Sequence, residues 1–214
     1  MNFNLKRAAI LPIAFFCFSN VNMAQETKPT PTPAAKPAAP AAAQPSPQAS
    51  PAPNPFANIP PAKPEDVASI DSIVKALYEV ISGDSGVKRD WNRFRSLFYP
   101  NAKMIPTGTN PNTGKPGGRF FTPEEYIERS GPFLEKEGFH EIGFAQRVEQ
   151  FGNIAHVFTT YQAKHKLSDE KPFLRGINSI QLINDGTRWW VLNIAWSQET
   201  PESPIPEKYL KSAQ

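Results

Sequence analysis

Hydrophobic residues near the start of the folded region recur at the three- and four-residue spacing of amphipathic helices. Pro64, followed by two acidic residues, opens the first run and Gly83 ends it, which predicts a helix from Pro64 to about residue 81. A shorter run begins at the capping residue Asp90 and stops before Pro100, and it predicts a second helix. The first helix places one apolar stripe toward a core: Val67, Ile70, Val74, Leu77 and Ile81.

The segment after the second helix changes character several times. Residues 102–105 are expected to form a short strand, and residues 106–119, rich in Gly, Pro, Asn and Thr, a long turn or loop. Thr122-Pro123-Glu124-Glu125 is a capping box with proline at the first helical position. It predicts a third helix to about Ser130, which Gly131-Pro132 is expected to break or kink.

After Gly138 the pattern alternates between apolar and polar residues, which indicates strands. Gly152-Asn153 and Asp185-Gly186 are typical two-residue hairpin turns. Helices followed by an antiparallel meander predict an α+β fold with helices on one face of the sheet. The four expected strands cover residues 139–150, 154–164, 173–183 and 188–198.

The first turn sets the register of its hairpin, and the register decides which side chains point inward. It places Gln146 opposite Thr159 and Phe144 opposite Tyr161. One face is mostly apolar and is expected to lie inside: Ile142, Phe144, Val148, Val157, Thr159 and Tyr161. The other face carries Arg147, Glu149, His156 and Gln162.

The second turn places Asn178 opposite Asn193. Ile180, Leu182, Trp189 and Val191 then share the face of these two residues. The opposite face is also largely apolar, so we expect helices to cover one side and a second subunit the other, which predicts a homodimer. A three-residue loop with a bulge would exchange the two faces. The opposite face carries Arg175, Ser179, Trp190, Leu192, Ile194 and Trp196.

Residues 65–200 resemble the nuclear transport factor 2-like superfamily. The resemblance lies in the order of elements and in the segments DWNRFRSLF, NAKMIPTG, GNIAHVFTTYQ and RGINSIQLINDGTRWWVLNIAW. It implies a cone-shaped, cystatin-like fold with three N-terminal helices packed on a bent antiparallel sheet around a cavity. Members include ketosteroid isomerase, scytalone dehydratase, SnoaL-type polyketide cyclases and non-enzymatic binding or assembly modules, so the resemblance implies the fold more firmly than an activity.

The isomerase chemistry of this superfamily needs particular residues. A tyrosine of the first helix acts as an oxyanion donor, and Tyr78 lies near the matching place. The acidic base after the first strand is absent, because that stretch reads Ile105-Pro106-Thr107, and no second acid on a later strand is evident. Without a base in reach of the substrate no proton is abstracted, so we expect no isomerase activity.

Several polar residues interrupt the predicted apolar interior, as in a small-molecule site. They could bind a ligand or satisfy one another. Arg175 is the alternative anchor, for a carboxylate, if the faces exchange. His140, beside Glu141 on the predicted inner face, is the single candidate for a catalytic base. The candidate ligand-binding residues are Tyr78, Gln146, Thr159, Tyr161, Asn178, Asn193 and Arg175.

The remaining histidines give no metal-ligand spacing. His156 is expected to pair with Glu149 across two strands, and His165 to be solvated between two lysines. We therefore expect neither a metal nor a cofactor.

The N-terminal region predicts export. Lys6 and Arg7 followed by an apolar run are typical of a signal peptide over residues 1–24, which is too short to span a bilayer. Residues 25–63, rich in Pro and Ala, predict a disordered spacer or a solvated tail. The folded domain is expected over residues 64–200, with a C-terminal extension over 201–214.

Cleavage would remove the single cysteine, Cys17, and two positive charges, so the net charge falls from +3 to +1. This excludes disulfides and an electrostatic footprint for nucleic acid. We expect a periplasmic or secreted protein with no stable membrane anchor.

Three functions agree with these observations. The favoured one is a module that binds a small apolar ligand in the cone. The others are a dimeric assembly module without a ligand and an enzyme of the dehydratase, cyclase or isomerase kind, for which only His140 is offered as a base.

Overall fold

The computed structural model describes residues 54–212. The predicted signal peptide and residues 25–53 of the predicted tail lie outside the described residues. Within the described part, no helix is long and apolar enough to cross a membrane.

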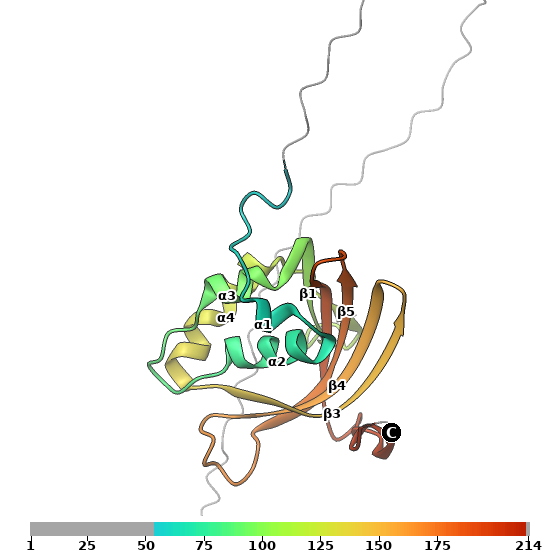
Figure 1. Ribbon diagram of the computed structural model, residues 1–214. Helices are drawn as coiled ribbons and strands as arrows, with labels where there is room; N and C mark the ends of the chain where they lie inside the picture. The colour runs from blue at the N-terminus through green and yellow to red at the C-terminus, as the bar shows by residue number, and fades with distance from the viewer. Residues whose placement is uncertain (1–53, 213–214) are drawn as a thin grey trace, which may run out of the picture. The chain divides into compact units, whose positions relative to one another are not determined.

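Four α-helices and a six-stranded sheet make up the domain, with strand order β2-β1-β6-β5-β4-β3. β1 and β6 pair in parallel, and the other neighbouring strands pair antiparallel. The sheet bends around the helices, which lie on its concave side (Figure 1). The elements are α1 (Pro64–Val67), α2 (Ile70–Ile81), α3 (Trp91–Ser96), β1 (Phe98–Thr109), β2 (Pro116–Gly118), α4 (Pro123–Glu137), β3 (His140–Phe151), β4 (Ile154–Lys164), β5 (Leu174–Asn184), β6 (Trp189–Gln198) and a 3-10 turn, η1 (Glu207–Tyr209).

The predicted first helix is two helices. Ser69 adopts an extended backbone with φ −142°, and its side chain accepts a hydrogen bond from the Ser72 backbone N–H. Ser69 is thus the N-cap of a new helix, and α2 begins at Ile70 after the single turn of α1. The apolar stripe continues across the break, which is why periodicity alone does not reveal it.

β1 and α4 are longer than the sequence predicts. β1 extends to Thr109 because it pairs in parallel with β6, and β2 pairs with its end, so part of the expected loop is strand. α4 continues through Pro132, where a break was expected. Gly131 lies against the Trp91 indole, and a Cβ there would come within 3.1 Å of Cζ2. The helix therefore packs closely on Trp91 of α3 at the residue before the proline.

The four strands of the meander are confirmed to within one residue at each end. The first turn is also confirmed, because Phe151 pairs with Ile154 and Gln146 with Thr159. Phe144, however, is an extra residue in a β-bulge, and Gly143 takes the expected place opposite Tyr161. A bulge exchanges the faces of the strand beyond it.

The second hairpin differs more from its prediction. Asn184 pairs with Trp189, so residues 185–188 form a four-residue loop, and a second bulge follows between Gln181 and Leu182. Asn178 therefore faces Trp196, and Asn193 faces Gln181. Of the residues expected on the opposite face, Ile194 and Trp196 instead pack with the core.

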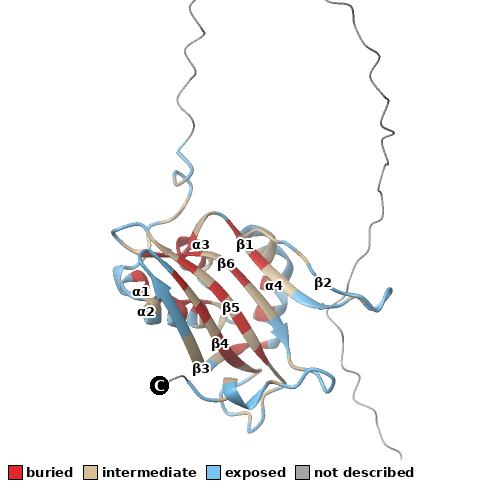
Figure 2. Cartoon of the chain, turned by 90° about the vertical axis from the view of Figure 1, so that its right-hand side faces the viewer, coloured by how far each residue is buried: buried red, intermediate tan, exposed pale blue. Residues whose placement is uncertain are grey.

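The core lies between the helices and the concave face of the sheet. Figure 2 shows the buried residues as stripes along β4, β5 and β6. The apolar stripe of α2 packs against Val157 of β4, Ile180 of β5 and Val191 of β6. α3 and β1 complete this core through Phe94, Leu97, Phe98, Ala102 and Met104.

Arg89 joins the ends of two helices from inside the protein. It is 7% exposed, and its guanidinium donates to the carbonyl oxygens of Ile81, Gly83 and Leu134 at 2.7–2.9 Å. It also donates to the Val87 carbonyl. Helix-end carbonyls lack partners within the helix, so this one side chain satisfies groups that would otherwise be buried unpaired.

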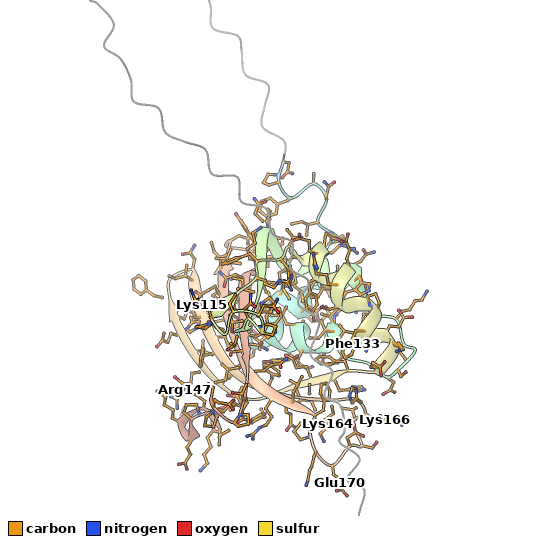
Figure 3. The ribbon with its side chains drawn as sticks, turned by 180° about the vertical axis from the view of Figure 1, so that it is seen from behind. Lys115, Phe133, Arg147, Lys164, Lys166 and Glu170 are labelled. Atoms are coloured by element: carbon orange, nitrogen blue, oxygen red, sulfur yellow. The ribbon has the colours of Figure 1, made fainter. Side chains whose placement is uncertain are left out.

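Both ends of the described chain pack on the domain. Phe56, in the predicted tail, lies against Tyr99 and Trp190 with ring centroids 5.2 and 5.5 Å apart. The C-terminal segment covers β3 and β4, where Thr160 Oγ1 donates to the Tyr209 carbonyl at 2.6 Å. Arg147 donates to the Lys208 carbonyl, also at 2.6 Å (Figure 3).

The prediction of a homodimer stays a prediction.

Replacing Arg89 with Met is expected to lower the free energy of unfolding by about 3 kcal/mol, because several buried carbonyl groups lose their donor. Urea unfolding of the purified protein measures this change. Lys88→Met is the matched control, since Lys88 is exposed and adjacent. An equal, small effect of both substitutions would contradict the structural role of Arg89.

Candidate functional site

α2 and β3 approach each other most closely at Gly143. A Cβ on this residue would lie 2.7 Å from Cε2 of Tyr78 and 3.2 Å from Oγ1 of Thr159. Any larger residue would therefore push the tyrosine ring away. The missing side chain lets Tyr78 lie flat on the strand and point its hydroxyl at the inner face of the sheet.

Four polar side chains meet there in one hydrogen-bond network. Tyr78 Oη donates to Thr159 Oγ1 at 3.0 Å. Asn178 Nδ2 donates to Tyr78 Oη at 3.2 Å and to Glu141 Oε1 at 2.9 Å. The four residues come from α2, β4, β5 and β3, so the network exists only in the folded protein.

Glu141 is the ionisable centre of the network. Its residue surface is partly open, but its carboxyl group is enclosed by protein atoms. This burial raises the pKa of Glu141 to about 7, although the hydrogen bond from Asn178 opposes the shift. Glu141 takes part in none of the ion pairs found within residues 54–212.

Three tyrosines surround this carboxyl group. Burial raises the pKa of Tyr78, Tyr126 and Tyr161, and the negative charge of Glu141 raises each further. All three stay neutral at physiological pH. Tyr126 reaches the site from α4, where its ring stacks on Phe94 with centroids 5.5 Å apart.

A cleft of about 560 Å³ opens from this network to the surface between α2 and β3. Its walls are mainly apolar, with Val74 on one side and Gly143, Phe144 and Ala145 on the other. Leu167, from the β4–β5 loop, adds to the apolar lining. Tyr78, Glu141 and Thr159 bring the polar network into its lining, which has further polar residues, among them Asp71, Lys75, Glu79, Ser82, His140 and Gln146. An apolar concavity with a few convergent polar groups is the usual make-up of a small-molecule site.

The structure brings together five of the seven residues proposed from the sequence. Tyr78, Thr159 and Asn178 share the network, and Tyr161, which is 2% exposed, lies beside it. Gln146 lines the cleft farther along β3, where its Nε2 donates to Asp71 Oδ1 at 2.8 Å.

The other two residues lie elsewhere. Asn193 pairs with Gln181 beyond the β6 bulge, so its side chain faces away from the network, contrary to the prediction. Arg175 pairs with Glu199 through two hydrogen bonds of 2.8 and 3.0 Å, outside the cleft. It is therefore not the expected alternative anchor in this cleft.

His140 does not lie on the inner face, where the sequence placed it, because the bulge at Phe144 turns the neighbouring Glu141 inward instead. His140 pairs with Lys164 while Glu141 pairs with Ala163, so the two side chains leave opposite sides of β3. His140 lines the edge of the cleft and its Nε2 lies 2.8 Å from Asp84 Oδ1. As expected, His156 lies near Glu149, with Nδ1 3.8 Å from the carboxylate, and its Nε2 also contacts Ser179.

Sequence reasoning missed Glu141 and Tyr126. The inference that no later strand offers an acid is wrong, because the Phe144 bulge turns Glu141 inward. The Gly-Phe pair at 143–144 within an alternating strand was the available signal, since glycine in a strand often marks a bulge or a close approach. Tyr126 follows the capping box of α4, and its inward direction depends on packing.

The raised pKa of Glu141 predicts a pH-dependent stability. The folded state holds this proton more tightly than the unfolded state, so stability is full below about pH 4.5 and falls as pH rises toward 7. The loss amounts to about 2–3 kcal/mol. The Glu141→Gln variant should lack this fall, which urea unfolding at pH 5 and pH 8 would measure. Glu149→Gln, at an exposed position of the same strand, is the control. If Glu141→Gln kept the wild-type pH dependence, the carboxyl group would have to be solvated.

No protein-family model matches the sequence, and comparison with curated proteins gives no match. Solved structures are similar at low identity. An NTF-2-like protein of unknown function from Silicibacter pomeroyi is 11% identical, with 62% of this chain and 94% of that chain covered and a TM-score of 0.45. A cystatin-like protein of unknown function from Nostoc punctiforme is 10% identical, with 65% and 94% covered and a TM-score of 0.47.

A putative ketosteroid isomerase from Parabacteroides distasonis is 17% identical, with 63% of this chain and 91% of that chain covered and a TM-score of 0.43. The order of helices and strands and the bent, unclosed sheet described above confirm the prediction from the sequence. The described domain is therefore an α+β fold whose helices lie on the concave side of a bent, unclosed sheet.

Proposed function

We propose that the domain binds a small, mostly apolar molecule in the cleft between α2 and β3. The ligand's apolar part lies against Val74, Phe144 and Leu167, and its polar group lies at Glu141 and Tyr78. The fold is compatible with a binding module and with an isomerase-type enzyme, and a fold by itself does not choose between them. The choice therefore rests on the site.

The observation that carries the proposal is the connection between exposed apolar side chains and a buried polar network. Phe144 is 40% exposed and Leu167 is 63% exposed, and both line the opening that leads to Glu141. Exposed apolar side chains around a concavity are typical of a ligand-binding site. A ligand that covered these side chains would gain free energy from the apolar area removed from water.

Catalysis by proton transfer is the second candidate, and Glu141 favours it. A carboxyl group with a pKa of about 7 exchanges protons readily at physiological pH, as a general acid or base must. It also replaces His140 as the candidate catalytic base, because His140 lies at the edge of the cleft.

The proposal includes export of the protein. Lys6, Arg7 and the apolar run behind them support a cleaved signal peptide and a periplasmic or secreted location. N-terminal sequencing of the protein collected outside the cytoplasm should give Gln25 as the first residue. Recovery of the protein only from the cytoplasm, with Met1 retained, would contradict export.

Ligand binding can be tested with Nile red, a neutral apolar dye whose fluorescence rises when it leaves water. The wild-type protein should bind the dye saturably, and Phe144→Ser should weaken binding by about fivefold or more, because part of the apolar wall is removed. Phe151→Ser is the matched control, since Phe151 lies on the same strand, is 86% exposed and does not line the cleft. Equal affinities of the two variants, or no saturable binding by the wild type, would refute this use of the cleft.

A further inference from the structure

We infer that the cleft selects an organic cation, whose ammonium group pairs with the Glu141 carboxylate among the surrounding tyrosine rings. The inference rests on the proposed function, because it names the class of ligand for the same cleft. Three independent features of the site support it: the charge of the lining, the lack of a counter-ion at Glu141, and the use of the hydrogen-bond donors.

The lining of the cleft carries more negative than positive charge. Its acidic residues are Asp71, Glu79 and Glu141, and Lys75 is the one Lys or Arg among the described residues that line it. Glu79 is balanced by two cations, Lys75 at 3.2 Å and Arg93 at 2.8 Å, so Asp71 and Glu141 are the lining acids outside the ion pairs found within residues 54–212. Asp71 contacts the neutral amide of Gln146. Opposite charges attract more strongly in such a partly enclosed site than in water, which favours a cation.

Within residues 54–212, no Lys, Arg or His forms an ion pair with Glu141. The groups that face its carboxyl group come from every neighbouring element: Tyr78 from α2, Tyr126 from α4, Tyr161 from β4 and Asn178 from β5. A carboxylate enclosed without a counter-charge is costly, and burial accordingly raises its pKa to about 7. A ligand cation would remove that cost by supplying the missing charge.

Two hydrogen-bond donors of the network, the Asn178 amide and the Tyr78 hydroxyl, are already in use. Both hydrogens of the Asn178 amide go to Tyr78 and Glu141, and the Tyr78 hydroxyl donates to Thr159. Neither side chain has a hydrogen left for a ligand carbonyl. Glu141 retains a second carboxylate oxygen, which accepts. The site therefore offers an acceptor to a ligand that donates, as an ammonium group does.

The aromatic rings add a second attraction of the same kind. Tyr78 lines the cleft directly, and Tyr126 and Tyr161 lie close enough to Glu141 for their ionisation to respond to its charge. Rings around a carboxylate attract alkylammonium groups through their negative faces. Contact with the rings would also remove the apolar substituents of such a cation from water.

One cationic and one neutral probe of similar size test the inference. The cation is benzyltrimethylammonium, whose charge does not titrate, and the neutral probe is acetophenone, a carbonyl acceptor. Their affinities for the full purified chain are measured by NMR titration of the Gly143 and Ala145 backbone amides. At pH 8.5 we expect the cation to bind about tenfold more tightly than acetophenone or better. At pH 6 its affinity should fall by about tenfold, because most of Glu141 is then protonated.

The Glu141→Gln variant should lose both the preference for the cation and its pH dependence, while acetophenone binding stays within about twofold. Glu149→Gln, on the same strand and outside the cleft, should behave as the wild type. His140→Gln removes the other ionisable group at the cleft edge and should keep the pH dependence, since Glu141 is intact.

The outcomes separate this inference from the proposed function. Equal or tighter binding of acetophenone, or an unchanged cation affinity in Glu141→Gln, would overturn the inference and leave a neutral-ligand site in place. If neither probe bound at millimolar concentration and neither displaced Nile red, both the inference and the proposed function would fail.

Discussion

The close packing of Tyr78 on Gly143 is the contact on which the site depends. It brings α2 within hydrogen-bond distance of the inner face of the sheet, because no Cβ separates the ring from the strand. The Tyr78 hydroxyl can then reach Thr159 and receive the amide of Asn178. These bonds tie one helix to two central strands, and the helix in turn buries its apolar stripe against the same strands.

The bulge at Phe144 determines what the site contains. Beyond it, β3 turns Glu141 and Gly143 inward, and Phe144 becomes part of the cleft wall. One inserted residue thus supplies the buried acid, the close approach of the helix and the apolar rim together. Bulges are common beside functional sites because they redirect side chains in this way.

Glu141 shows a conflict between stability and function. A glutamine could accept the hydrogen bond from Asn178 at this position without the cost of an enclosed charge. The carbonyl groups at the helix ends receive their hydrogen bonds from Arg89 and not from any group at Glu141. The fold therefore does not require an acid at this position. An uncompensated carboxyl group at the end of an open cleft is better explained by a ligand or a reaction than by folding.

The sequence by itself determined the class of the fold and its elements. Periodicity and turn residues located the helices and the four long strands, because these signals are local, and the order of elements indicated an α+β fold. It also identified Thr159 and Asn178 as polar residues of the interior, whereas Tyr78 was proposed from the resemblance to ketosteroid isomerases. The break at Ser69 is a local cap with Ser72, which the unbroken apolar stripe conceals. Tertiary structure alone decided the continuation of α4 through Pro132 and the direction of Glu141, His140 and Asn193. The directions of these side chains depend on bulges in strands that pair with residues distant in the chain, and a one-residue bulge is enough to exchange the faces of a strand.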